Sequence, residues 1–461
     1  MSNLTRRDFL AGTAGGSLTA RRVRATNSTG LIELDLQPRQ DWIRIGGRDA
    51  FAYAFNGMVP GPLIEAYPGD SVRITFRNLL SEPTNLHFHG LHIPPTGTAD
   101  NVMLEMPRGE SFVYDFQIPV SHPGGTFWYH PHLHGSVARQ VSRGLAGVFI
   151  VRGELDQIPE IAAAPEHVLV LQDFDFNAGG LPAEPSLMEQ MTGRTGDLIT
   201  VSGSLNPAIP ILSGGWVRLR ILNASSSRFY RLTLEEHPLV LIATDGGAIG
   251  SPREHRAILL APGERIEVMV QGAKDGGAYR LLHVPYPRDG AMASYGPVVL
   301  ATLRYEGVSE NPWRLPERLV SVQPLAAPSV RRTFVLGSGA AGPGIGMGMR
   351  GMAFTINGRL FDSRRVDTRA RLNNVEEWEF INSSSMDHPM HLHTNPFQVA
   401  GADGTPELAW KDVVLVPAGS RVRIRTALLD FSGETMYHCH ILDHEDLGMM
   451  GLMEIARDAP S

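Results

Sequence analysis

Apolar and polar residues alternate along many short stretches of this chain, and three of these stretches share a plan. They span residues 71–78, 216–223 and 375–382, and each ends in asparagine. A period of two is the pattern of a strand that buries one face and exposes the other. Each stretch follows a turn of similar sequence (55–57, 201–203 and 356–358) and precedes a Pro/Gly turn (107–109, 262–263 and 417–419). The pattern therefore predicts strands in three repeated arrangements.

Each repeat has the size of a domain. The leading valines, Val72, Val217 and Val375, are spaced by roughly 150 residues, which is a common domain length. The 461 residues include 49 Gly and 33 Pro and few long helical patterns, which favours antiparallel β-sandwiches. Stretches rich in Pro and polar residues near 152–164 and 307–328 indicate the boundaries. We expect an all-β chain with domains at residues 29–155, 156–312 and 313–461.

Residues 1–28 do not fit the repeats. Arg6 and Arg7, followed by Asp8 and Phe9, resemble a twin-arginine export signal. The apolar stretch behind them is short and rich in glycine, and arginines stand where a cleavage region of small residues is expected. We expect an exported protein, periplasmic or extracellular, with a disordered basic tail as the alternative interpretation.

The charge and hydropathy of the chain argue against two classes of partner. The formal net charge is -7 and the isoelectric point is about 6.2, which gives no electrostatic case for binding nucleic acid. The sequence contains no apolar run long enough to span a membrane. We therefore expect small-molecule partners and a monomeric protein.

The single cysteine, Cys439, lies between two histidines. If this segment is a strand, His438 and His440 point to one face and Cys439 to the other, so metals bound on both faces would lie on the order of 10 Å apart. One cysteine cannot form an internal disulfide, so its role is either chemical or that of a buried thiol. His444 and Met449 follow shortly after. Thiolate, imidazole and thioether are the ligands of a blue-copper electron-transfer site.

Ten of the 17 histidines fall into four clusters: His87 and His89; His130 and His132; His388, His391 and His393; and His438, His440 and His444. A spacing of two places paired imidazoles on one face of a strand, which suits a shared metal cluster. Zinc also binds imidazole, but a structural zinc site takes four ligands, so zinc alone explains this set poorly. The histidines of the middle repeat (His167, His237, His255 and His283) are isolated.

These four motifs, in this order, resemble those of three-domain multicopper oxidases of the laccase and bacterial copper-efflux-oxidase type, over about residues 30–456. The resemblance implies three consecutive cupredoxin-like Greek-key β-sandwich domains and four copper ions. It assigns His388, Cys439, His444 and axial Met449 to a type-1 copper, and His87 and His391 to a type-2 copper. It assigns His89, His130 and His440 to one type-3 copper, and His132, His393 and His438 to the other.

The resemblance also implies where the chemistry occurs. The trinuclear cluster would lie between the first and third domains, with the second as a spacer. Cys439 would pass electrons to it, and Asp100 and Glu445 resemble acids that relay protons, although Asp100 is displaced from the usual register. We expect Met386 and Asp387 to line the rim of the type-1 site. His92, His122 and His134 are left over, and we expect His134 to have a supporting or structural role.

The implied activity is the one-electron oxidation of phenolic or organic reductants, with Cu(I) or Fe(II) alongside, coupled to the reduction of dioxygen to water. A dedicated cuprous or ferrous oxidase for copper tolerance is the alternative. Met347, Met349 and Met352 lie in a Gly-rich stretch and are either soft copper ligands or apolar filler. A copper-free cell-division or assembly protein of the same fold is a non-enzyme alternative, disfavoured because every ligand position is filled. A copper nitrite reductase would lack the trinuclear set.

Overall fold

The computed structural model describes residues 22–24, 30–287, 296–310, 313–340 and 352–457. The twin-arginine motif, Met347 and Met349 lie outside these residues, so the predictions made for them stay predictions. Residues Arg22–Arg24, which the sequence analysis assigned to an export signal and tail, form strand β1 beside β5, where Arg24 lies 2.9 Å from Glu65. No helix in the described part of the chain is both long and apolar enough to cross a membrane.

The first unit is a sandwich of two sheets with an additional hairpin. One sheet has the order β2 (Leu31–Leu36), β6 (Ser71–Arg77), β8 (Ser111–Gln117). The other has the order β1, β5 (Leu63–Ala66), β10 (Gly147–Val151), β9 (Gly125–His130), β7 (His87–His89). The hairpin pairs β3 (Pro38–Ile45) with β4 (Arg48–Phe55), and the short helix α1 (Val137–Ser142) precedes β10. Phe76, Phe88 and Tyr114 are fully buried in its core.

The second unit follows two short helices, η1 (Glu154–Gln157) and α2 (Pro159–Ala162). Its larger sheet has the order β12 (Leu198–Val201), β11 (Glu166–Phe174), β14 (Trp216–Asn223), β19 (Arg265–Gln271), β16 (Leu239–Thr244), β17 (Gly247–His255). Its smaller sheet has the order β13 (Ala208–Ser213), β21 (Val298–Val308), β20 (Ala278–Val284), β15 (Tyr230–Leu234), β18 (Ile258–Leu260). The helix α3 (Leu187–Thr192) stands between β11 and β12 in sequence.

The third unit repeats the two-sheet plan. One sheet has the order β23 (Met352–Ile356), β22 (Val330–Ala340), β25 (Asn374–Asn382), β29 (Arg421–Leu428), β27 (Phe397–Ala400). The other has the order β24 (Thr368–Arg371), β31 (Met450–Ala456), β30 (Gly433–Cys439), β26 (His388–Leu392), β28 (Val413–Val416), and α4 (Leu442–Asp446) joins β30 to β31. Trp378, Phe334 and Tyr437 pack together in its core. The all-β fold expected from the sequence is confirmed, while the domain boundaries stay a prediction.

The asparagine at the end of each predicted repeat strand has the same role in all three units. Its side-chain amide donates to a carbonyl just before the Pro/Gly turn: Asn78 to Met106 at 2.8 Å, Asn223 to Leu260 at 3.0 Å and Asn382 to Val416 at 2.9 Å. Its side-chain oxygen accepts from the backbone N–H two residues later, at Leu80, Ser225 and Ser384. Each asparagine therefore ties the end of one strand to the turn that starts the next.

Strand β14 differs from the expected pattern of one buried and one exposed face. Arg218 and Arg220 alternate with the core residues as predicted, yet both are buried. The two guanidinium groups bind the carboxylates of Glu267 and Asp156. Arg220 also donates to the hydroxyl of Thr126 on β9 of the first unit at 3.0 Å. A neighbouring unit covers the outer face of the strand. The alternation of apolar and polar residues therefore could not show whether Arg218 and Arg220 are exposed.

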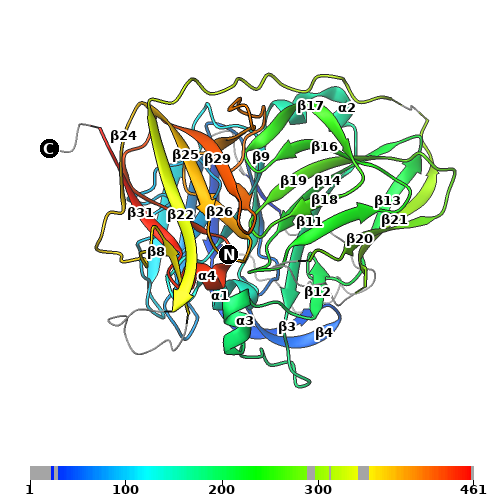
Figure 1. The fold of residues 1–461 in the computed structure, drawn as a ribbon. Coiled ribbons are helices and arrows are strands. Elements are labelled where there is room, and N and C mark those ends of the chain that lie inside the picture. Colours follow the sequence, from blue (N-terminus) through cyan, green and yellow to red (C-terminus); the bar gives the residue numbers. More distant parts are fainter. Residues whose placement is uncertain (1–21, 25–29, 288–295, 311–312, 341–351, 458–461) are drawn as a thin grey trace.

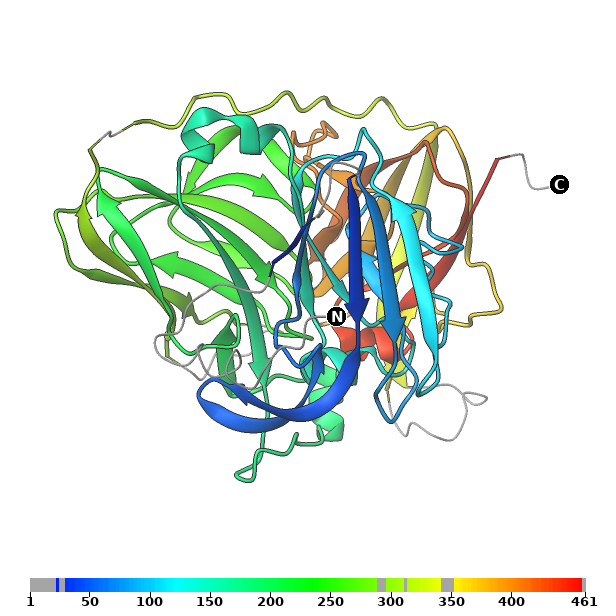
Figure 2. The ribbon, with the colours of Figure 1, turned by 180° about the vertical axis from the view of Figure 1, so that it is seen from behind.

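The three units pack around a common centre. Figure 1 shows the second unit (green) on one side, with the third unit (yellow to red) and the first (blue to cyan) packed together on the other. An extended segment before β22 crosses over the top from the second unit to the third. Figure 2 shows the β3–β4 hairpin curling beneath the second unit, where Ile45 and Ala52 pack with Phe174.

Candidate metal centre

The segment around Cys439 ends a strand, as its sequence predicts. β30 pairs with β26 so that His391 lies opposite His438 and Met390 opposite Cys439. The rings of His438 and His440 lie together, with centroids 5.7 Å apart. The side chain of Cys439 instead enters the core of the third unit. Two groups of donor atoms therefore lie on opposite sides of one piece of backbone.

The cysteine group consists of His388, Cys439 and His444, all buried. The sulfur of Cys439 lies 3.5 Å from Nδ1 of His388 and 3.8 Å from Nδ1 of His444. The Nε2 of His444 lies 3.0 Å from the carbonyl oxygen of Met191. A carbonyl can only accept, so His444 carries its proton on Nε2 and turns the Nδ1 lone pair toward the sulfur.

Met449, rather than its neighbour Met450, shares the core cluster of the cysteine. Met449 is fully buried, and its carbonyl accepts a hydrogen bond from the backbone N–H of Cys439 at 3.0 Å. Met450 belongs to a different cluster, with Val102 and Met436. The thioether of Met449, which the sequence analysis assigned to the cysteine group, thus lies in the same hydrophobic core as Cys439.

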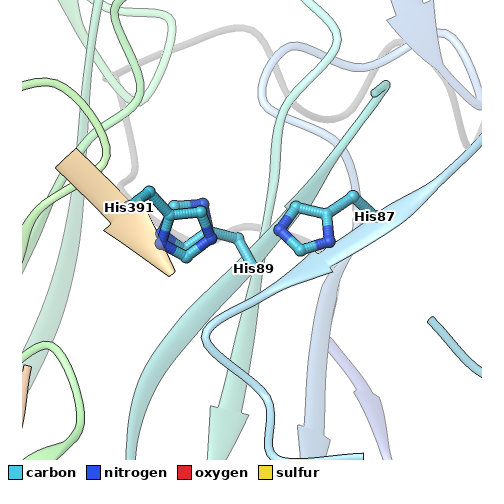
Figure 3. A group of neighbouring side chains, drawn as sticks. All are labelled: His87, His89 and His391. Carbon is cyan, nitrogen blue, oxygen red and sulfur yellow. The ribbon is translucent and has the colours of Figure 1, made fainter. Parts of the chain in front are cut away.

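The histidine group contains eight imidazoles from the first and third units: His87, His89, His130, His132, His391, His393, His438 and His440. Their donor atoms gather in three buried triples: His87, His89 and His391; His89, His130 and His440; and His132, His393 and His438. Figure 3 shows the rings of His89 and His391 lying against each other, with His87 facing them. The centroids of the two stacked rings are 3.8 Å apart.

Hydrogen bonds fix which nitrogen of five rings faces inward. Nδ1 of His130, His391 and His438 lies 2.8 to 3.0 Å from a backbone carbonyl, so this nitrogen donates and Nε2 keeps its lone pair. His87 is held in the same way, through Nδ1, by the carboxylate of Asp100. His89 is reversed: its Nε2 lies 3.0 Å from Oδ1 of Asp412, which leaves Nδ1 available.

Burial favours the neutral form of His87, His89, His130 and His391. It is the largest cause that lowers the pKa of His87, His89 and His391 well below the ordinary value, and neighbouring imidazoles lower it further. Burial also lowers the pKa of His130 to about 3. A neutral imidazole has a lone pair to give, so these four rings are in the form that binds metal.

The two predicted relay acids contact different histidines of the histidine group. Asp100 is buried, contacts His87 and accepts a hydrogen bond from the N–H of Phe88 at 2.8 Å. Burial raises the pKa of Asp100 to about 8. The fully buried carboxylate of Glu445 has oxygens 3.0 Å from Nδ1 of His438 and 3.4 Å from Nε2 of His132.

Family models identify the chain. Three models, each described as multicopper oxidase, match residues 39–156, 163–308 and 342–459. Together they cover most of the sequence. The chain belongs to the multicopper oxidase family.

Relatives of this multicopper oxidase include proteins with different names. A multicopper oxidase (mco) of Staphylococcus haemolyticus is 28% identical over 87% of this chain and 83% of its own. The cell division protein FtsP of Yersinia pestis is 30% identical over 82% of this chain and 79% of its own.

Solved structures show the same architecture. A multicopper oxidase of Campylobacter jejuni, described as a metallo-oxidase, has 30% identity and a TM-score of 0.83, covering 95% of this chain and 94% of its own. A laccase of Pediococcus acidilactici has 27% identity and a TM-score of 0.81, covering 95% and 92%. The likeness therefore extends over all three units.

The donor atoms of this multicopper oxidase fit copper. Imidazoles around a thiol, with a thioether in the same compartment, form a set that copper prefers. Nε2 of His87, His391 and His440 is buried without a hydrogen-bond partner among the described residues. Such nitrogens are costly in a protein interior unless a metal takes their lone pairs.

The remaining histidines lie outside these groups in the described part of the multicopper oxidase. His92 links the first and third units, through Nδ1 to the carbonyl of Thr394 and Nε2 to Asp430, and its backbone N–H donates to His122. His134 is exposed, with its ring 5.0 Å from that of Phe361. The four histidines of the second unit join no donor group.

Three functional features of the multicopper oxidase were missed from the sequence. Asp412 orients His89, and only its position before an apolar strand hints that it is buried. Asp446 accepts hydrogen bonds from the backbone N–H groups of Gly135, Val137 and Ala138, which joins α4 to the start of α1. Met191 covers His444 from the second unit, and no motif marks that contact.

Proposed function

We propose that this protein is a laccase-like oxidase that couples one-electron oxidation of phenolic or organic reductants, or of Cu(I) or Fe(II), to the reduction of dioxygen. The observation that carries the proposal is the complete donor set. Every ligand position of the resemblance is filled, and the donor groups gather from the first and third units into buried positions.

The proposal assigns a type-1 copper to the cysteine group with Met449. It assigns a type-2 copper to His87 and His391. Two type-3 coppers are assigned to the triples His89, His130, His440 and His132, His393, His438. When bound, these ions would supply one-electron acceptance at the cysteine group and four-electron reduction of dioxygen to two waters at the histidine group.

The chain itself connects the two groups. Cys439 is bonded through single peptides to His438 and His440, so the shortest covalent route between the groups is one residue on either side. The backbone here is rigid, because β30 is held by β26 on one side and β31 on the other. Both groups are buried, which excludes water from the donor atoms and limits release of reactive products.

The two acids have separate roles in this proposal. Asp100 accepts from Nδ1 of His87 and so orients the ring, with its own protonation favoured by burial. Glu445 reaches toward His132 and His438 without forming a hydrogen bond of good geometry in the described part of the chain. A carboxyl in that position could deliver a proton to oxygen reduced nearby.

A dedicated metallo-oxidase is the second candidate function. It is favoured by the structural neighbour from Campylobacter jejuni, which is described as a metallo-oxidase and matches at 30% identity. The FtsP relatives raise a cell-division role as a third candidate. The filled donor set disfavours this third candidate, because a copper-free role would not require eleven buried imidazole and thiol ligands.

The test is metal analysis of the purified protein, with optical spectra and oxygen uptake. Four coppers per chain, an intense blue band and oxygen uptake with dimethoxyphenol, ferrous ion or cuprous ion would support the proposal. Ratios of kcat/KM for the three reductants would separate laccase from metallo-oxidase. A colourless protein with four coppers would contradict the assignment of Cys439.

A further inference from the structure

The edge of His444 that would accept electrons is covered by the second unit. Its Nε2 donates to the carbonyl of Met191 at 3.0 Å, and one ring face stacks on Phe354 with centroids 3.8 Å apart. The residue as a whole is fully buried. A flat organic molecule therefore has no direct access to the imidazole edge in this arrangement.

Residues 185–194, hereafter the α3 cover, form the segment that covers His444. This segment lies on the surface and its helix adds nothing to the hydrophobic core. Helix α3 has no buried residue, and Leu187 and Met188 are 57% and 64% exposed. Ser186 caps the helix by accepting from the N–H of Glu189. A surface helix without a hydrophobic anchor needs another contact to hold its place.

That contact is a latch between Arg194 and Asp443. The guanidinium donates to both oxygens of the carboxylate at 2.7 to 3.1 Å, and the N–H of Arg194 donates to the same group at 2.8 Å. Asp443 is only 2% exposed and directly precedes His444 in α4. The latch therefore fixes the α3 cover to the segment that carries the proposed copper ligand.

The α3 cover also packs closely against the residue that precedes α4. This contact is made by Gly193, the residue before Arg194. Gly193 has φ of 82°, and a Cβ there would lie 2.8 Å from Cγ2 of Ile441 and 2.7 Å from Oγ of Ser227. Carboxylates stand around the base of the cover, since Asp175, Glu184 and Glu189 line a small cavity with Arg143 and Arg194. Glu184 pairs with Arg143 and Arg194 pairs with Asp443, so Asp175 and Glu189 are left as acids of this cavity without an ion pair among the described residues.

We propose that the α3 cover determines the reductant specificity of the cysteine group. It blocks contact between flat phenols and His444 but still allows electron transfer from compact cations such as Fe(II). Cations are drawn to the acids and can pass electrons across the Met191 peptide, whereas phenols need contact with the ring edge. This inference rests on the proposed oxidase function and sorts its candidate reductants. Arg194 acts through the cover and is a positioning residue.

The test opens the latch with Arg194→Gln and uses Arg280→Gln as the matched control. Arg280→Gln removes an ion pair with Glu235 elsewhere in the second unit but leaves the Arg194 contacts and the acids of the cavity in place. The first readout is acylation of His444 by diethyl pyrocarbonate in the copper-free full chain, followed by mass spectrometry, with exposed His134 as internal reference. Wild type and the control should protect His444, and Arg194→Gln should raise its labelling on the order of 10-fold, as expected for loss of a charge-assisted pair.

The second readout is the ratio of phenol to ferrous turnover in the copper-loaded protein. Opening should raise kcat/KM for dimethoxyphenol on the order of 10-fold, mainly through KM, with ferrous turnover nearly unchanged. Arg194→Gln leaves the buried Asp443 without its cation, so a second variant replaces residues 187–191 by Gly and Ser and keeps the latch. It should give the same two shifts.

Equal labelling of His444 in wild type and in both opened variants would overturn the inference, as would parallel rises for phenol and Fe(II). A copper-loaded protein that takes up no oxygen with any reductant would overturn the proposed function instead. The labelling of the copper-free chain remains decisive for the cover in that case.

Discussion

Arg265 and Asp412 form a buried ion pair that joins all three units. Arg265, on β19 of the second unit, donates to both carboxylate oxygens of Asp412, just before β28 of the third. The Oδ1 atom that receives Arg265 at 2.6 Å also lies 3.0 Å from Nε2 of His89 in the first unit. The arginine thus orients the carboxylate, and the carboxylate orients a proposed copper ligand.

Asp412→Asn should therefore weaken copper binding at the histidine group. Hydrogen-bond partners of metal-ligating histidines typically change metal affinity by about 10- to 100-fold, and we expect a loss in that range. The measurement is copper retained during dialysis against a chelator, together with the blue band. Asp430→Asn is the control, because Asp430 holds His92 at an exposed position. Equal copper retention in the two variants would contradict the role of Asp412.

Cys439→Ser should abolish the blue colour and the oxidase activity while leaving the fold largely intact. The thiol is fully buried in the core of the third unit, so a hydroxyl without a full set of partners costs about 1–3 kcal/mol of unfolding free energy. Optical spectra, metal content and circular dichroism check the outcome. Copper held by the histidine group should remain, and a variant that stays blue would place the colour elsewhere.

Glu445→Gln should slow oxygen reduction more than reduction of the type-1 site. The substitution keeps the size of the side chain beside His132 and His438 but removes its ability to deliver a proton. Stopped-flow spectroscopy separates the steps, with anaerobic bleaching of the blue band by a reductant and then its return after oxygen is added. Slower bleaching with unchanged reoxidation would instead place Glu445 on the reductant side.

Asn223→Ala should destabilise the second unit without altering the chemistry. The side chain is buried, and its loss leaves the carbonyl of Leu260 and the N–H of Ser225 without their partner. We expect a loss of about 2–3 kcal/mol in the free energy of unfolding, measured by urea denaturation. The control Asn177→Ala removes an exposed turn side chain and should cost less than about 1 kcal/mol.

Acid should destabilise the boundary between the first and second units through Glu166. Burial would raise its pKa, but the hydrogen bond from Arg152 and the charges of Arg220, Arg152 and Arg218 hold the pKa well below the usual range. A lowered folded pKa gives stability that is complete above the unfolded value of about 4.3 and is lost as pH falls toward the folded value.

We therefore expect the free energy of unfolding to decline below about pH 4, and Glu166→Gln to flatten that decline. Urea denaturation across this pH range measures the slope. Glu235→Gln is the control, because Glu235 pairs with Arg280 near the surface. A wild-type slope preserved in Glu166→Gln would assign acid sensitivity to other carboxylates.

Local pattern was sufficient for the repeated strands and for the motifs that hold the donors. The period of two places His438 and His440 together and Cys439 apart, and this needs only the geometry of one strand. The expected strand at 216–223 matches β14 in its bounds. The local pattern could not indicate that Arg218 and Arg220 are buried, because another unit covers them.

The features that escaped prediction all depend on packing between distant segments. Arg194 meets Asp443 across 249 positions, and Arg265 meets Asp412 across 147. Neither residue type is unusual at its site, and arginine and aspartate side chains are ordinarily exposed. Such pairs become visible only when the units are placed together, whereas histidine clusters stand out in a sequence by their rarity.

The wide separation of the donors along the chain sets an order for biosynthesis. His132 and His438 are 306 positions apart, yet their Nε2 atoms lie 3.1 Å from each other. A ribosome must synthesise the chain past His438 before these donors can meet, so a product truncated before that residue would lack the full metal-binding set. Copper bound between these histidines would therefore mark a chain whose first and third units have both been made and packed together.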